Sequence, residues 1–215
     1  MRDSILFDGE GVVIDSEPIW DRGQGEFLRR RNIVYDREKV KPLLAGRSME
    51  EGVRLLQSLY GFGGSPEILA KERIAIVKDL FADATEFVPG FMSFYHRLPA
   101  RFKTCIATMM PEDLLDVVID RLDLRKLFGT RIFSPRSRTM RGKPAPDLFL
   151  YAAEQLHSSP QRCIVIEDSP NGIEAANRAG IFCIGIATTF APSRLTKANR
   201  VVSSFEEIDL SQLDS

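Results

Sequence analysis

The sequence predicts an α/β fold: a doubly wound, Rossmann-like parallel sheet core with an inserted α-helical cap domain. Short apolar runs alternate with helical patterns along most of the chain. The first run ends abruptly in turn residues, and a block of helical pattern without strands separates it from the others. Strands that alternate with helices are typical of right-handed βαβ units and of a parallel sheet covered on both faces.

The expected strands are short and mainly apolar. Ser4–Phe7 stops at Asp8-Gly9-Glu10-Gly11, as expected of a buried parallel strand followed by a turn. Similar runs lie at Thr104–Ala107, Arg131–Phe133, Cys163–Ile166 and Ile181–Ile186. Helical patterns lie between them at Pro111–Arg121, Pro146–His157 and Pro170–Arg178. For the last helix we expect Ser169 to cap the start and Gly180 to mark the end.

The inserted block is expected to be entirely helical. Its helical patterns lie at Phe27–Arg30, Met49–Tyr60 and Pro66–Phe81. Gly61–Pro66 breaks two of these helices, and Phe87-Val88-Pro89-Gly90 is the expected return hinge. We therefore predict a core domain of residues 1–16 and 87–215 and a cap domain of residues 17–86.

Composition favours a soluble, cytoplasmic protein. The formal net charge of the 215 residues is −1, without a long run of one sign, so bulk charge predicts neither a nucleic-acid nor a membrane partner. No apolar stretch approaches the roughly 20 residues of a membrane span, and Met1 does not begin a signal peptide. Cys105, Cys163 and Cys183 each sit in an apolar run and are expected to be reduced core residues. We expect a monomer, since no feature of the sequence requires a larger assembly.

Polar side chains follow three of the expected strands. Asp8 and Glu10 follow the first, Thr108 the second, and the pair Glu167-Asp168 the fourth. Lys143 stands in a Gly-Lys-Pro sequence before a helix. Because ligands of open α/β sheets bind at the carboxyl ends of the strands, we expect these side chains to converge on one rim.

This set of residues suits phosphoryl transfer. A carboxylate that attacks a phosphate is repelled by it, so a cation such as Mg²⁺ must lie between them, with Asp8 and Asp168 as oxygen ligands. Thr108 and the backbone N–H of Met109 would hold phosphate oxygens, and Lys143 would neutralise charge. The intermediate would be an aspartyl phosphate. A second acid near Asp8 would protonate the leaving alcohol and then activate water.

Four motifs resemble the haloacid dehalogenase superfamily, in its β-phosphoglucomutase-like and CbbY-like phosphatase branch with a small helical cap. They stand in the family's order and cover nearly the whole chain. The motifs are the run from Phe7 to Pro18, Ile106-Ala107-Thr108, the run from Gly142 to Asp147, and the run from Ile166 to Gly172.

The resemblance implies a role for each residue of the site. Asp8 is the expected nucleophile and a ligand of Mg²⁺, Asp168 is a second ligand, and the backbone carbonyl of residue 10 is a third. Arg47, in a cap loop of the kind that reaches over the substrate, is a candidate substrate contact, although an exposed arginine at a helix start is an equally good interpretation. The remaining roles are an outer-shell acid for Glu167, phosphate binding for Thr108 and charge neutralisation for Lys143.

Glu10 is the main departure from the family, which has Asp at this position. The extra methylene leaves a working acid in altered geometry, or it lets Glu10 ligate the metal and turns the protein into a catalytically weak or inactive binder of a phosphorylated ligand. Met109 and Met110 replace the small polar residues of the family, so the site keeps backbone donors and loses hydroxyls.

The subclass expected is a hydrolase that acts on a small phosphorylated metabolite, with sugar phosphates as the first class to consider. Sugar-phosphate mutases carry a histidine where this chain has Trp20 and depend on the Asp that is Glu10 here. Dehalogenases need no metal and lack the acidic pair. His96 and His157 are expected on helices of the core, away from the site. The role of Trp20, pocket lining or hinge packing, stays open.

Overall fold

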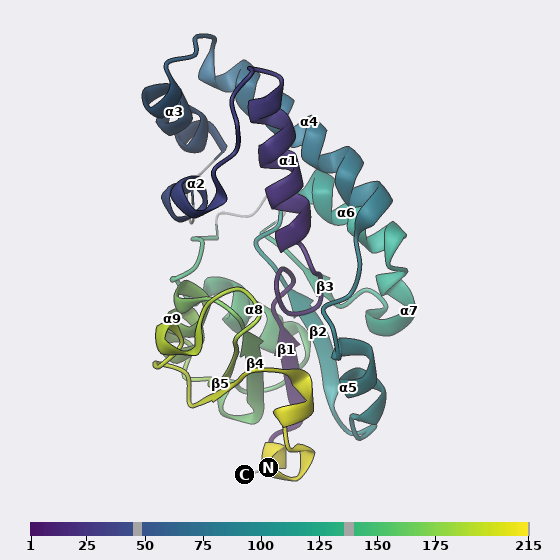
Figure 1. The fold of residues 1–215 in the computed structure, drawn as a ribbon. Helices are drawn as coiled ribbons and strands as arrows, with labels where there is room; N and C mark the ends of the chain where they lie inside the picture. Colours follow the sequence, from purple (N-terminus) through teal and green to yellow (C-terminus); the bar gives the residue numbers. More distant parts are fainter. Residues whose placement is uncertain (45–48, 136–139, 215) are drawn as a thin grey trace. The chain divides into compact units, whose positions relative to one another are not determined.

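The computed structural model describes residues 1–44, 49–135 and 140–214 (Figure 1). The chain forms two compact units. One contains Met1–Asp15 and Glu86–Ser215 and is called the α/β unit here; the other contains Ser16–Thr85 and is called the helical unit.

The α/β unit is built on a six-stranded sheet among the described residues, with every neighbouring pair parallel. The strand order is β3-β2-β1-β4-β5-β6. This confirms the predicted α/β class and doubly wound sheet. The strands are β1 (Ser4–Phe7), β2 (Lys103–Ala107), β3 (Ile132–Phe133), β4 (Cys163–Glu167), β5 (Phe182–Ile186) and β6 (Arg200–Val202).

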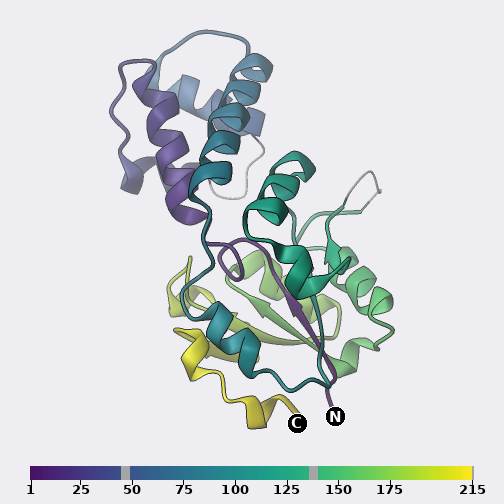
Figure 2. The ribbon, with the colours of Figure 1, turned by 90° about the vertical axis from the view of Figure 1, so that its right-hand side faces the viewer.

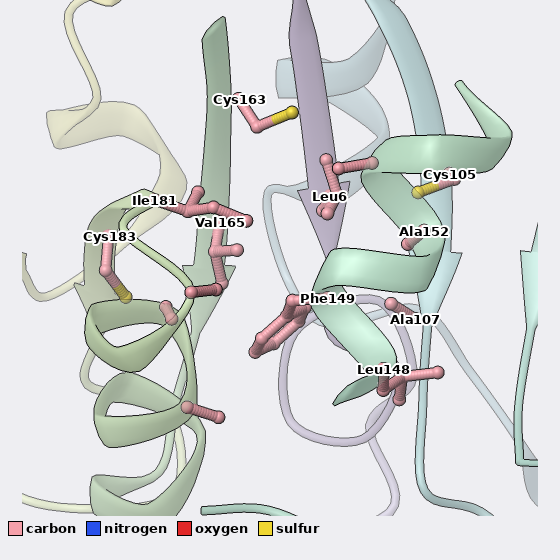
Figure 3. Close-up of a cluster of buried hydrophobic side chains, with 14 of the residues drawn as sticks. Leu6, Cys105, Ala107, Leu148, Phe149, Ala152, Cys163, Val165, Ile181 and Cys183 are labelled. Carbon is pink, nitrogen blue, oxygen red and sulfur yellow. The ribbon is translucent and has the colours of Figure 1, made fainter. Parts of the chain in front are cut away.

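Alternate residues of each strand point to opposite sides of the sheet, and helices cover both of these faces. Leu6 of β1 packs on the face covered by α8 (Asp147–Gln155) and α9 (Pro170–Arg178), as Figure 3 shows for α8. Phe7 points to the other face, where its ring contacts Phe91 on α5 (Phe91–Arg97) and Phe128 on α7 (Leu124–Phe128). Figures 1 and 2 show α5 on the side of the sheet opposite α8.

Helix α9 begins and ends as its sequence predicts. The Ser169 hydroxyl accepts a hydrogen bond from the Gly172 N–H, and Pro170 occupies the first turn, where its missing N–H costs no helical hydrogen bond. Gly180 follows with φ +69°, a conformation that glycine adopts without strain. Helix α6 (Glu112–Arg121) also lies where its pattern predicts it.

One histidine in this unit lies elsewhere than the sequence predicts. His157 does not lie on α8: the helix ends at Gln155, and His157 follows it with φ +50°. His96 does lie on a helix, α5. Cys105, Cys163 and Cys183 are buried free thiols, as expected. Within the described ranges, no helix combines the length and the apolar character that a membrane crossing would need.

The helical unit contains α1 (Glu17–Arg29), α2 (Arg37–Leu44), α3 (Met49–Tyr60) and α4 (Pro66–Ala84). Helices α1 and α4 pack against each other. Their buried apolar side chains form a small hydrophobic core together with those of α2 and α3. Trp20 packs edge-on against Phe81 inside this unit, with ring centroids 5.6 Å apart. Arg73 is buried and donates a hydrogen bond to Gln24.

Candidate active site

The candidate site lies where the strand order reverses. The chain passes from β1 to β2 and β3 on one side and then returns to β4 on the other, so the carboxyl ends of β1 and β4 flank the switch point at which open α/β sheets bind ligands. Asp8 follows β1 and Asp168 follows β4. The Asp8 N–H donates to the Ile166 carbonyl, at 3.0 Å, which holds the two strand ends together.

Three carboxylates meet at this point. Among the described residues, Asp8, Glu167 and Asp168 form a group whose carboxylate oxygens lie within 4.8 Å of one another, and all three residues are buried. The sequence places Asp8 and Asp168 at adjacent strand ends. The structure adds that their side chains turn toward each other rather than toward solvent.

Lys143 joins two of the three acids. Its Nζ donates to Asp8 Oδ1 at 2.5 Å and to Glu167 Oε1 at 2.6 Å. The same ammonium lies 4.8 Å from the centroid of the Phe149 ring on α8. The side chain is therefore held by an aromatic face and by two carboxylates, and the lysine reaches the nucleophile position that the sequence predicts for Asp8.

Glu167 has both carboxylate oxygens occupied by protein groups. Oε1 accepts from Lys143, and Oε2 accepts from the Ser169 backbone N–H at 2.6 Å and from the Ser169 hydroxyl at 2.9 Å. A Cβ at Gly172 would lie 1.6 Å from Oε1, so only glycine leaves room for this carboxylate. These contacts suit an acid that orients Lys143 from outside the reacting centre.

Thr108 stands beside the nucleophile turn. It is fully buried, its N–H donates to Phe133 at the end of β3, and its hydroxyl oxygen accepts from the Met110 N–H at 3.1 Å. A Cβ at Gly9 would lie 2.6 Å from Thr108 Oγ1, so the hydroxyl packs directly on the residue after Asp8. The bond from Met110 leaves the hydroxyl proton of Thr108 to be donated to a ligand.

The two methionines after β2 have different environments. Met110 is buried, whereas 37% of Met109 is exposed, and the Met109 Cε packs 3.3 Å from the Cβ position of Gly142. Met109 therefore lies on the rim next to the loop that carries Lys143.

Glu10 lies on a tight turn after Asp8. The N–H groups of Val13 and Ile14 both donate to the Gly9 carbonyl, and Gly11, with φ +72°, donates back to Ile14. Glu10 is half-buried, and its charge contributes to raising the pKa of Asp8. Its carboxylate does not belong to the group of three acids described above. Ligation of a metal by the Glu10 side chain stays a prediction.

Burial dominates the ionisation of the site. It raises the pKa of Asp8 to about 7; Lys143 opposes this effect, whereas the charges of Glu167 and Glu10 add to it. Burial and the neighbouring Glu167 and Asp8 also raise the pKa of Asp168 well above its ordinary value. Burial lowers the pKa of Lys143, but Asp8 and Glu167 outweigh that effect, so the pKa is raised overall and the lysine stays charged.

The donor set fits a hard divalent cation. Lys143 is the ammonium that pairs with these buried carboxylates among the described residues, so full ionisation of all three leaves two negative charges that it does not balance. Carboxylate oxygens are the ligands that Mg²⁺ and Ca²⁺ prefer. Asp8 and Asp168 are the best candidates for direct ligands, because both oxygens of Glu167 already accept hydrogen bonds from the protein.

Two contacts at the site come from a segment without a predicted role. Thr188 and Thr189 follow β5. The Thr188 hydroxyl donates to the Gly11 carbonyl at 2.5 Å. The Thr189 hydroxyl lies beside the Asp168 carboxylate, next to Gly11, and acts to lower the pKa of Asp168 against the effect of burial. Asp8, Thr108 and Asp168 directly follow strands, whereas Ala187 separates β5 from the two threonines; a search for polar residues within three positions of each strand end would identify them.

Arg47 lies outside the described residues. Its role as a substrate contact stays a prediction.

The chain matches known proteins along most of its length. The family model for haloacid dehalogenase-like hydrolases matches residues 3–180. Validoxylamine A 7'-phosphate phosphatase of Streptomyces hygroscopicus subsp. limoneus is 30% identical, over 94% of this chain and 94% of its own. The phosphorylated carbohydrates phosphatase of Thermotoga maritima is 30% identical, over 83% of this chain and 82% of its own.

A solved structure of the same family has a similar fold. The HAD family hydrolase of Deinococcus radiodurans R1, crystallised with bound phosphate and sodium, superposes with a TM-score of 0.83 at 25% identity, covering 99% of this chain and 96% of its own. The chain therefore belongs to the haloacid dehalogenase-like hydrolase family, in its phosphatase branch.

Proposed function

We propose that this enzyme, a phosphoric monoester hydrolase, is a Mg²⁺-dependent phosphatase that cleaves a small phosphorylated metabolite through an aspartyl phosphate on Asp8. The observation that carries the proposal is the 2.5 Å contact between Lys143 and Asp8 inside a buried group of acids at the switch point of the sheet. Sugar phosphates are the first substrate class to test, because the similar Thermotoga maritima protein is a phosphorylated carbohydrates phosphatase.

Asp8 performs the first step. An oxygen of its carboxylate forms a bond to phosphorus while the bond between phosphorus and the alcohol oxygen breaks, and Glu10 gives its proton to that oxygen. Glu10 then takes a proton from water, whose oxygen attacks phosphorus. The bond between phosphorus and Asp8 breaks, inorganic phosphate leaves and the Asp8 carboxylate is restored.

The surrounding groups hold the phosphoryl oxygens. The buried Thr108 hydroxyl and the Met109 N–H are the proposed donors, and Lys143 balances the charge that Asp8 and the phosphate share. Glu167 and Ser169 keep Lys143 in place.

The proposed ligands of Mg²⁺ are Asp8, Asp168 and the backbone carbonyl of residue 10. Bound there, Mg²⁺ would screen the repulsion between the Asp8 carboxylate and the phosphate. The Glu10 side chain is either the acid and base described above or a further ligand. In the second case it no longer transfers protons, and the protein binds a phosphorylated ligand without turning it over.

The helical unit is the proposed cap. Arg47 and Trp20 are candidate contacts for the substrate, since cap loops of this family cover the phosphate ester. Trp20 packs on Phe81 inside the helical unit, which supports a packing role beside the proposed substrate contact. We further propose a cytoplasmic monomer whose partner is the substrate alone, without nucleic acid or membrane.

Glu10 supports the second candidate function, that of a weak or inactive relative that binds a phosphorylated ligand. A misplacement of about 1 Å can cost on the order of 10²-fold in rate. A sugar-phosphate mutase is the less favoured alternative, because Trp20 and Glu10 stand where mutases have histidine and aspartate.

The decisive experiment is phosphate release from a panel of sugar and nucleotide monophosphates, with Mg²⁺ and with EDTA. Release that requires Mg²⁺ and disappears in Asp8→Asn supports the hydrolase. A folded wild-type protein that binds Mg²⁺ and releases no phosphate from any ester would instead favour the binder.

A further inference from the structure

The loop after β5 touches two parts of the site that lie far apart in the sequence. The Thr188 hydroxyl donates to the carbonyl of Gly11, on the turn that carries Glu10. The Thr189 hydroxyl lies beside the carboxylate of Asp168, which follows β4, because both groups crowd the same point next to Gly11. One dipeptide thus contacts both the turn after the nucleophile and a proposed metal ligand.

Gly11 shows how closely these groups pack. A Cβ built at Gly11 would lie 2.0 Å from Asp168 Oδ2 and 2.6 Å from Thr189 Oγ1. Gly11 itself has φ +72°, so the turn approaches the carboxylate with its backbone alone. The Asp168 carboxylate and the Thr189 hydroxyl therefore both lie against the turn, and a change in the turn or in Thr189 would leave the carboxylate less confined.

The loop itself is anchored to the sheet. The Ala187 N–H donates to the Val202 carbonyl on β6 at 2.9 Å, and the Thr188 N–H donates to the Ile186 carbonyl on β5 at 3.0 Å. The two hydroxyls therefore extend from a backbone that β5 and β6 hold in place. Because this backbone is held in place, the two hydroxyls can hold the groups that they contact in fixed positions.

We infer that Thr188 and Thr189 are positioning residues: Thr188 fixes the turn that carries Glu10 and the carbonyl of residue 10, and Thr189 fixes the Asp168 carboxylate. The inference rests on the proposed function, because it assigns the threonines to the proposed Mg²⁺ site. Both act on groups that would face the cation, so their removal should weaken the binding of Mg²⁺ even where no substrate is present.

The test compares Thr188→Val and Thr189→Val with the wild type. Valine keeps the shape of threonine and removes the hydroxyl. Each variant is titrated with MgCl₂, and the dissociation constant is taken from the rise in melting temperature. A hydrogen bond to a charged group suggests a loss of affinity of about 10-fold or more for Thr189→Val, and the loss for Thr188→Val should have the same direction.

Serine variants separate positioning from general packing. Thr188→Ser and Thr189→Ser keep the hydroxyl and lose the methyl group, so Mg²⁺ affinity should return to nearly the wild-type value. Thr104→Val is the matched control: this buried threonine of β2 shares a hydrogen bond with Tyr95, away from the site. The control should lower the melting temperature without changing the affinity for Mg²⁺.

The outcomes separate the positioning role of the threonines from the proposed Mg²⁺-dependent function. If the wild type binds Mg²⁺ and both valine variants bind it equally well, the positioning role is wrong and the proposed function stands. If the serine variants bind as weakly as the valine variants, packing rather than the hydroxyl is responsible, and the inference also fails. A wild type without any affinity for Mg²⁺ overturns both, because no metal site then exists for the threonines to position.

Discussion

At the scale of single residues, the side chain of Glu10 is one methylene longer than that of an aspartate, and this extra length decides where its carboxyl group lies. The turn after Asp8 is tied by the hydrogen bonds of Gly9, Gly11 and Ile14, so the backbone of Glu10 has little freedom to compensate for a longer side chain. The half-buried Glu10 is close enough to influence the pKa of Asp8. In the proposed mechanism, side-chain length at this position therefore sets the distance from the acid to the leaving group.

Glu10→Asp should raise turnover by about 10²-fold, because it moves the acid back by one methylene to the length that the family uses. The measurement is kcat for the best ester of the panel at saturating Mg²⁺. Glu10→Gln serves as the control and should lower kcat, since an amide cannot donate the proton. Equal kcat in the wild type and in Glu10→Asp would mean that the glutamate is already well placed, and a lower kcat in Glu10→Asp would mean that the site is built around it.

Lys143→Met should both inactivate the enzyme and destabilise its α/β unit at neutral pH. The change leaves Asp8 and Glu167 buried without their ammonium, and the removal of one partner of a buried pair costs about 3–5 kcal/mol. We expect a lower melting temperature in EDTA, partly recovered with Mg²⁺. Lys126→Met is the matched control, since Lys126 pairs with Asp123 at an exposed site. Similar melting temperatures for both variants would contradict the coupling of Lys143 to the acids.

At the scale of elements, residues that directly follow strands could be predicted from the sequence. Asp8, Thr108 and Asp168 are placed by one rule, that the carboxyl ends of parallel strands meet at one edge. Lys143 does not follow a strand, and it contacts Asp8 across 135 residues of sequence. Its place in a Gly-Lys-Pro sequence before a helix suggested the same rim, and the family resemblance gave it a role there, but no local pattern records so distant a contact.

Some elements could not be predicted because their patterns are too short. Helices α5 and α7 span seven and five residues, fewer than two helical turns, and are held by aromatic contacts to Phe7 rather than by a repeating apolar face. Strand β6 spans three residues and begins with Arg200. The contacts that stabilise these elements come from the sheet, so they appear only when the sheet is assembled.

The start of α9 provides a test at this scale. Gly172→Ala places a methyl group where the structure has the Glu167 carboxylate, at 1.6 Å. Glu167 would have to move, and with it Lys143. We expect a loss of turnover of about 10²-fold or more, as for other displacements of about 1 Å. The measurement is kcat with Mg²⁺, alongside the melting temperature.

Gly63→Ala is the control for Gly172→Ala, because a Cβ at Gly63 meets no atom within 4 Å. Its turnover should equal that of the wild type. Near-normal turnover in Gly172→Ala would show that Glu167 tolerates displacement and does not orient Lys143.

At the scale of the whole molecule, the two connections to the helical unit run together within the α/β unit. The Asp15 N–H donates to the Glu86 carbonyl, and the Val88 N–H donates to the Val13 carbonyl, each at 3.0 Å. Ile14 and Phe87 form an antiparallel bridge between these bonds. The first of these connections continues directly from the turn that carries Glu10, so the link to the helical unit and the acid share one short segment.

The stability of the whole protein should depend on pH and Mg²⁺ together. In the folded state the pKa of Asp8 is about 7, against an ordinary value of 3.8, so the folded protein holds this proton more tightly than the unfolded chain. The stabilisation that results is fully present below about pH 4 and is lost as the pH rises through about 7. The raised pKa of Asp168 acts in the same direction.

In EDTA we therefore expect the melting temperature to fall between pH 5 and pH 8. A shift of about three pKa units at Asp8 corresponds to at most about 4 kcal/mol, and each kcal/mol moves the melting temperature by about 2–4 °C. Mg²⁺ should raise the melting temperature more at pH 8 than at pH 5, because it binds the ionised carboxylates and competes with protons for them. Asp8→Asn removes the titrating group and should flatten the fall, whereas Asp120→Asn, at an exposed position of α6, should leave it unchanged. If Asp8→Asn falls as steeply as the wild type, another group is responsible and the buried acids are not the source of the pH dependence.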